Sequence, residues 1–188
     1  MTKITKLTTA FLAIILSIAF TGCKDDDPQP ALEYQTEGTI KGKITGVSKD
    51  NSYTFNDDFT YSQYSLLTES YSLYQVNNDG SYDVSISRAD FSTSGTASIT
   101  FTLSNAADTT PDDVYISINY YKESNDKIIN FRMNSSDDEN TVAITDFTFD
   151  GTTGKAKGKF TLSGTENSTD KNATVSGDFE VTAKKEVQ

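Results

Sequence analysis

The chain has 188 residues, of which 16 are Lys or Arg and 27 are Asp or Glu, so its formal net charge is −11. It contains no histidine, no tryptophan and one cysteine. The missing histidine excludes Ser-His-Asp and Cys-His catalytic units and histidine zinc sites. The single cysteine excludes an intramolecular disulfide. The acidic charge opposes nucleic-acid binding, which needs a basic surface. We therefore expect no nucleic-acid partner, no cofactor and no enzyme activity.

Residues 1–22 have the pattern of a secretory signal peptide. Lys3 and Lys6 give a positive start, and the apolar run Leu7–Phe20 follows without any acidic residue. This run is shorter than the about 20 residues that a membrane-spanning helix needs. Its length, its position and the flanking charge predict an exported protein.

The end of this segment resembles the lipobox of bacterial lipoproteins. Phe20-Thr21-Gly22-Cys23 places two small residues directly before the cysteine. The resemblance implies cleavage before Cys23, which becomes the first mature residue and carries diacylglycerol and an N-acyl chain. Several acyl chains on one residue anchor a protein stably, because each buried CH₂ contributes ~0.8 kcal/mol. We expect Cys23 to be lipidated and the membrane to be a partner through this anchor.

Residues 23–33 are predicted to be a flexible acidic tether. The segment Lys24–Asp27 is followed by Pro28 and Pro30, and such a composition keeps a chain solvated and extended. An acidic cluster after a lipidated cysteine also resembles the surface-export signal of lipoproteins in some Gram-negative lineages. Lys rather than Asp follows Cys23, so the usual inner-membrane retention signal is absent. We expect an outer-membrane protein that faces the cell exterior, with the periplasmic face as the alternative.

Residues 34–185 are expected to form one β-domain. Without Lys3 and Lys6, 14 basic and 27 acidic residues give the mature chain a net charge of −13. About 150 residues suffice for one domain, and apolar residues recur at every second position, which is the period of a strand. The apolar faces, in chain order, are Tyr82, Val84 and Ile86; Ala97, Ile99, Phe101 and Leu103; Val114, Ile116, Ile118 and Tyr120; Ile129, Phe131 and Met133; Ala156, Phe160 and Leu162; and Ala173, Val175, Phe179 and Val181.

Two local signals refine this pattern. Asp79-Gly80 supplies the positive φ that a tight hairpin turn needs. Phe147 and Phe149 are out of phase with the apolar positions before them, which predicts a bulge near Thr145-Asp146. One stretch is ambiguous, because tyrosines between residues 61 and 74 recur at a helical spacing. Tyrosine is a mediocre helix former, so we favour strands there.

The glycines and the two terminal strands bear on the architecture. Glycines within strands predict bulges, corners or a close approach of two backbones, and they occur here as Gly38, Gly42, Gly46, Gly158, Gly164 and Gly177. The long segments 34–47 and 172–183 are expected to pair and to remove sheet edges.

The C-terminal third carries a second resemblance. Ile144–Phe147, Gly158–Phe160 and Val175–Val181 resemble the close of small bacterial lipoprotein β-domains that are described as calycin-like or lipocalin-like. The resemblance implies a fold and an anchor but no activity. The expected fold class is therefore all-β, a single antiparallel domain of about nine or ten strands. A calycin-like barrel is favoured, and a β-sandwich is the alternative.

Acidic loops are the candidate metal sites. Ca²⁺ takes about six to eight oxygen ligands, and the chain offers Asp57-Asp58, Asp137-Asp138-Glu139 and the loop that holds Asp108, Asp112 and Asp113. No segment matches the EF-hand pattern, and aspartate is common in turns for conformational reasons. The candidate ligands for a metal are Asp108, Asp112 and Asp113.

Tyrosines are the candidate ligand contacts. Six of the ten tyrosines lie between Tyr53 and Tyr82, and exposed aromatic rings stack on sugars or form interfaces. Tyrosines that alternate in strands are more often half-buried. The candidate contacts are Tyr61, Tyr64, Tyr71 and Tyr74.

Three functions are compatible with these features. The preferred hypothesis is a lipid-anchored, surface-exposed β-domain with a non-enzymatic binding or accessory role, whose partner is a glycan or a protein. The first alternative is a carrier of a small ligand or glycan with a tyrosine-rich pocket. The second is a carboxylate-dependent hydrolase, which needs two acidic side chains about 5–10 Å apart across a cleft.

Overall fold

A computed structural model describes residues 36–47, 53–63, 71–124, 127–136, 140–166 and 171–186. The chain divides into the units Met1–Glu33 and Tyr34–Gln188, and all described residues belong to the second. These residues form strands and turns without any helix, so none of them forms a helix that could cross a membrane. The predicted signal peptide, Cys23 and the tether lie outside the described residues.

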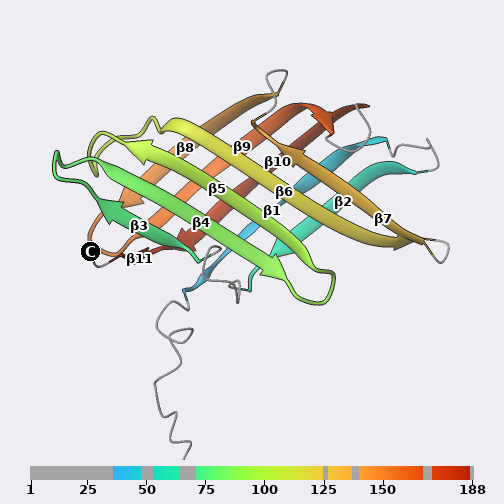
Figure 1. Cartoon of the computed structure of the whole chain (residues 1–188), viewed down its shortest axis with the longest axis horizontal. Coiled ribbons are helices and arrows are strands. Elements are labelled where there is room, and N and C mark those ends of the chain that lie inside the picture. The colour runs from blue at the N-terminus through green and yellow to red at the C-terminus, as the bar shows by residue number, and fades with distance from the viewer. Residues whose placement is uncertain are drawn as a thin grey trace, which may run out of the picture. The chain divides into compact units, whose positions relative to one another are not determined.

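Eleven strands are present among the described residues (Figure 1). They are β1 (Gly38–Val47), β2 (Thr54–Tyr61), β3 (Leu73–Val76), β4 (Tyr82–Asp90), β5 (Gly95–Leu103), β6 (Asp112–Ser124), β7 (Lys127–Asn134), β8 (Thr141–Asp150), β9 (Lys155–Glu166), β10 (Lys171–Thr182) and β11 (Lys184–Lys185). The all-β prediction is confirmed.

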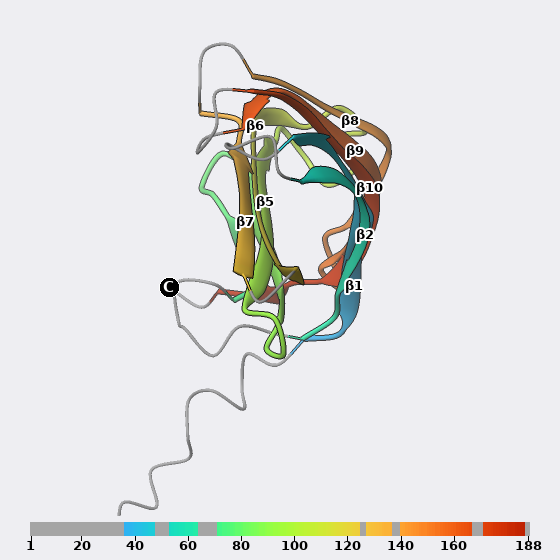
Figure 2. The ribbon, with the colours of Figure 1, turned by 90° about the vertical axis from the view of Figure 1, so that its right-hand side faces the viewer.

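The strands form two sheets that lie face to face (Figure 2). One has the order β2-β1-β10-β9-β8 and the other the order β11-β3-β4-β5-β6-β7. Neighbours are antiparallel except β11, which pairs parallel with β3. The expected pairing of the first and last long strands is confirmed, since β1 pairs with β10. It leaves β2 and β8 at the edges of that sheet, because β2 adds to the other side of β1.

The core fills the space between the sheets. Ala97, Ile99, Phe101 and Leu103 are all buried on the inner face of β5, as the alternation predicts. Aromatic pairs join the two layers through edge-to-face contacts. The ring centroids of the pairs that join the sheets are 5.0 Å apart for Phe101 and Phe147, 5.3 Å for Phe55 and Phe131, and 5.5 Å for Tyr74 and Phe149.

The two local signals are confirmed. Gly80 has φ +86° in the hairpin turn between β3 and β4. The β8–β9 register shifts between Thr145 and Thr148, and Asp146 has φ +51°, so a bulge lies where the phase change predicted it. This bulge turns Phe147 and Phe149 inward, where both are buried.

The β1–β10 pair contains a close backbone approach at paired glycines. Gly42 lies opposite Gly177, and a Cβ at Gly177 would stand 2.1 Å from the carbonyl oxygen of Lys41. A Cβ at Gly42 would stand 2.4 Å from the carbonyl oxygen of Ser176. Such distances are too short for any side chain, so glycine is required on both strands.

Candidate functional site

A groove on the outer face of the second sheet is the candidate site, and we call it the β3–β4 groove. It has a volume of about 380 Å³. The residues that line it come from the segment before β3, from β3, β4 and β5, and from the C-terminal segment after β11: Tyr71, Leu73, Tyr74, Gln75, Asp83, Val84, Ser85, Thr100 and Glu186.

Strand alternation places the polar side chains of the groove. Tyr74 and Val84 are buried and belong to the core, so their strand neighbours project from the opposite face. Gln75 pairs with Asp83 across the β3–β4 ladder. Glu186 reaches the groove because its N–H donates to the carbonyl oxygen of Tyr74 at 2.9 Å, directly after the β11–β3 pairing.

The chemistry of the groove is rich in hydrogen-bond acceptors. Asp83 and Glu186 contribute carboxylates, and Gln75 contributes an amide. Ser85 and Thr100 add hydroxyl groups, while no Lys or Arg is among the lining residues described. The groove therefore suits an uncharged or cationic molecule that presents hydroxyl or amine donors.

The candidate tyrosines are mostly used inside the fold. Tyr61, Tyr71 and Tyr74 are buried, and Tyr64 lies outside the described residues. The Tyr61 hydroxyl donates to the carbonyl oxygen of Asn119 at 2.9 Å, and the Tyr74 hydroxyl donates to that of Gly151 at 3.2 Å. Burial raises the pKa of both phenols above the ordinary value. Of the four, Tyr71 and Tyr74 line the groove.

The aspartates of the acidic loop accept hydrogen bonds from residues of the same loop and of the neighbouring strand. Asp108 accepts hydrogen bonds from the Ser104 hydroxyl at 2.6 Å and from the Thr110 N–H at 3.0 Å. The Ser104 bond is the main reason that the pKa of Asp108 is lowered. Asp113, with φ +49°, accepts from Thr102 at 3.4 Å.

No metal cluster forms in the part of the chain that the structure describes. There, no three His, Cys, Asp or Glu side chains gather closely enough to hold an ion. Asp108, Asp112 and Asp113 are thus not brought together as a ligand set. Residues 137–139, the other acidic candidates, lie outside the described part.

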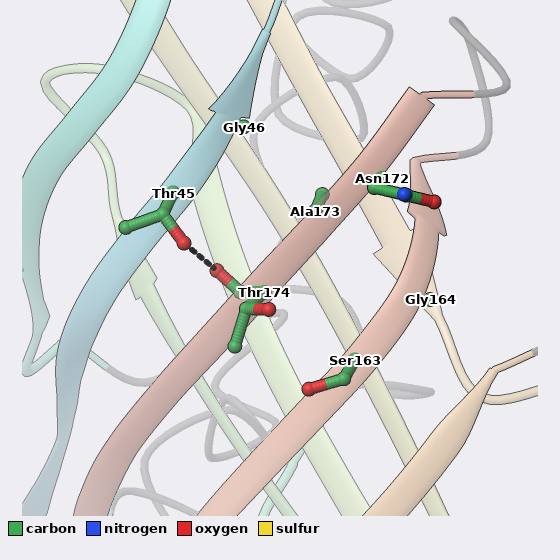
Figure 3. Close-up of a pocket in the computed structure, with 7 residues that line it drawn as sticks. All are labelled: Thr45, Gly46, Ser163, Gly164, Asn172, Ala173 and Thr174. Carbon is green, nitrogen blue, oxygen red and sulfur yellow. Dashed lines mark hydrogen bonds between the residues drawn. The ribbon is translucent and has the colours of Figure 1, made fainter.

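A second hollow lies on the first sheet, across β1, β10 and β9 (Figure 3). It has a volume of about 340 Å³. Thr45, Thr174 and Ser163 form one cross-strand row in it, because Thr45 pairs with Thr174 and Thr174 with Ser163. The Thr45 hydroxyl donates to the carbonyl oxygen of Thr174 at 3.3 Å. The row carries hydroxyl groups without any charge.

A polar cluster that the sequence pattern did not indicate joins the two sheets. Tyr53 donates to Asp57, with oxygen distances of 2.8 and 3.0 Å. Lys122 of β6 forms an ion pair with Asp57 of β2, and its ammonium also contacts the Tyr53 hydroxyl. Hydrogen bonds to Asp57 and Tyr53 raise the pKa of Lys122 above its ordinary value. The partners are mutually satisfied, so the cluster fastens β2 to β6 rather than offering a reactive group.

Comparison with known proteins adds no family to this description. No protein-family model matches the sequence, and no curated protein matches it.

Proposed function

We propose that the protein is a lipid-anchored, surface-exposed, non-enzymatic binding module of the outer membrane. The apolar run Leu7–Phe20, the lipobox ending in Cys23 and the acidic segment after it support the anchor and the location. The unit Tyr34–Gln188 begins eleven residues after Cys23 in the sequence. The β3–β4 groove is the proposed binding site.

The observation that carries the binding role is the convergence of two parts of the chain, far apart in the sequence, on one groove. Gln75 and Asp83 come from a hairpin, and Glu186 comes from a segment about 100 residues later in the sequence. Pockets that bind small molecules place a few polar groups beside apolar ones. Here Leu73 and Val84 are the apolar residues that line the groove beside the polar ones.

The proposed ligand is a glycan that carries no negative charge. Sugar hydroxyls donate to carboxylate and amide oxygens, and these are the groups that Asp83, Glu186 and Gln75 present. An acidic sugar would meet two carboxylates without a compensating cation among the described lining residues. The groove should therefore prefer neutral or amino sugars to uronic acids.

A glycan array probed with the chain from Cys23 to Gln188 tests the site. We expect binding to neutral or amino oligosaccharides and its loss in the Asp83→Asn and Glu186→Gln variants. Asp58→Asn is the matched control, because Asp58 is an exposed acid on β2. Equal binding by all three variants, or binding confined to uronic acids, would contradict the proposal.

A carboxylate-dependent hydrolase is the second candidate, since two carboxylates line the same groove. In such enzymes one carboxyl acts as general acid and the other as base or nucleophile. Release of reducing ends from a bound oligosaccharide, abolished by Asp83→Asn without loss of binding, would favour this function over simple binding.

For the architecture, we propose a β-sandwich in preference to a calycin-like barrel. Hydrogen-bonded neighbours among the described residues leave β2, β8, β7 and β11 at sheet edges. Aromatic contacts such as Phe101–Phe147 occupy the interior. A sandwich with a filled interior places ligand binding on an outer face, whereas a barrel would offer its lumen.

The location is tested by treating intact cells with a protease. A surface-exposed domain is removed without cell lysis. Digestion only after lysis would place it on the periplasmic face.

A further inference from the structure

One hollow of the second sheet is lined by the exposed Ile128, and the exposed Phe91 directly precedes Ser92 and Thr93, which also line it. Phe91, in the β4–β5 turn, is 47% exposed, and Ile128, at the start of β7, is 77% exposed. They are the large hydrophobic side chains that stand out as exposed among the described residues. The hollow has a volume of about 200 Å³ and is lined by Ser92, Thr93, Tyr121, Lys122, Glu123 and Ile128. We call Phe91, Ile128 and this hollow the apolar end.

The β4–β5 turn holds Phe91 in a defined position. The Asp90 carboxylate accepts from the Ser92 N–H at 2.9 Å, from the Ser92 hydroxyl at 2.6 Å and from the Thr93 hydroxyl at 3.0 Å. The Phe91 N–H donates to the Gln63 side chain at 2.7 Å. Phe91 is therefore an exposed residue in an ordered turn.

The chain joins the domain at this same end. Arg88 lies three residues before Phe91 and is fully buried. Its guanidinium donates to the carbonyl oxygens of Thr36 at 3.1 Å, Glu37 at 2.6 Å and Gly38 at 3.0 Å. Figures 1 and 2 both show the β4–β5 turn and the start of β1 at one end of the two sheets.

This arrangement limits how far the apolar end can lie from an anchor at Cys23. Thirteen residue steps separate Cys23 from Thr36, and even a fully extended chain of that length spans only about 45 Å. Because Arg88 binds Thr36 and lies three residues before Phe91, an anchored chain keeps this end of the domain near the bilayer. A weak contact between the apolar end and the lipid then suffices to keep the two together, since a short tether gives effective concentrations on the order of millimolar.

The side chains of the apolar end match those found at membrane interfaces. Phe91 and Ile128 are exposed apolar side chains, and Tyr121, which lines the hollow, has an apolar ring with a polar hydroxyl group. Aromatic rings, tyrosine in particular, are enriched at the level of lipid headgroups. The net charge of −13 of the mature chain opposes contact with a strongly anionic surface, so the contact is tested on a zwitterionic one.

We propose that the apolar end rests in the headgroup region of the bilayer that carries the anchor, and so orients the domain with the β5–β6 loop away from the lipid. The proposal rests on the proposed function in one respect, the anchor at Cys23. The test therefore supplies the anchor chemically, so that a failure of natural lipidation does not affect its outcome.

The chain from Cys23 to Gln188 holds every described residue and one cysteine, which couples to a maleimide lipid in phosphatidylcholine vesicles with brominated acyl chains. The chain has no tryptophan, so Phe91→Trp introduces a single reporter. Thr109→Trp, in the exposed loop at the other end of β5, is the matched control. Circular dichroism identical to that of the parent establishes that both variants fold.

We expect emission from the Phe91→Trp variant to shift to shorter wavelength and to lose intensity to the brominated lipid, whereas emission from the Thr109→Trp control stays unchanged. Adding Ile128→Asp should reverse the shift. Equal quenching in both variants would overturn the proposal. So would a shift in the Phe91→Trp variant without vesicles that accompanies dimerisation in sedimentation, because a second copy would then cover this end.

Discussion

Arg88 is a fully buried cation whose described partners are carbonyl and hydroxyl oxygens. Besides the carbonyl oxygens of residues 36–38 at the start of β1, it donates to the Ser72 hydroxyl and the Ser87 carbonyl oxygen, each at 2.8 Å. Burial lowers its pKa to about 10, which still leaves it charged at neutral pH. One side chain thus satisfies acceptors from three segments and fastens the start of β1 to β4.

We predict that Arg88→Met lowers the free energy of unfolding by roughly 3–5 kcal/mol, because the buried acceptors lose their donor. Urea denaturation measures the loss, and hydrogen exchange should show faster opening of residues 36–40. Arg132→Met is the control, because Arg132 is exposed. A loss no larger than that of the control would contradict this role.

The sequence pattern predicts only part of the role of Arg88. Arg88 continues the inward phase of Val84 and Ile86. From alternation alone, however, a cation near the end of a strand is predicted to be exposed. Its acceptors lie about 50 residues earlier, so their convergence depends on tertiary structure. Glu186 reaches the groove for the same reason, through the pairing of β11 with β3.

At the scale of the elements, the alternation of β5 and the bulge of β8 were predictable from local sequence. Period-two burial and a change of phase are visible within ten residues. A close backbone approach of β1 and β10 was predictable, since glycines recur in both strands. The register that sets Gly42 opposite Gly177 was not, because only long-range pairing selects it.

We predict that Gly177→Ala and Gly42→Ala each destabilise the domain by about 2 kcal/mol or more, since the added methyl group forces the two backbones apart. Gly46→Ala should be milder, because its Cβ would meet the Ala173 Cβ at 3.1 Å instead of a carbonyl oxygen at less than 2.5 Å. Thermal unfolding ranks the three variants. An order in which Gly46→Ala is the most damaging would refute the contact.

At the scale of the whole molecule, the shifted pKa values predict how the stability of the domain depends on pH. Hydrogen bonds from Ser or Thr hydroxyl groups lower the pKa of Asp79, Asp90, Asp108 and Asp150. A hydrogen bond from Lys159 lowers the pKa of Asp146, and one from Lys155 lowers that of Glu180. Burial raises the pKa of Tyr61, Tyr74 and Tyr120. No histidine is present to titrate between these groups.

We predict a stability plateau across neutral pH. A lowered carboxyl pKa contributes stability above the ordinary value of 3.8 for Asp, and this contribution is lost as the pH falls through the folded value. A raised tyrosine pKa contributes stability that is complete below 10.0 and is lost as the pH rises above it. Unfolding midpoints measured across the pH range check this, and a steep change between about pH 6 and 8 would contradict it.

The proposed location depends on the anchor at Cys23, and the mass of the mature N-terminus tests this anchor most directly. The protein is purified from its native membrane, digested, and the N-terminal peptide is analysed by mass spectrometry. We predict a peptide that begins at Cys23 and carries diacylglycerol and an N-acyl chain. A peptide with an unmodified Cys23, or one that retains residues before it, would contradict the account.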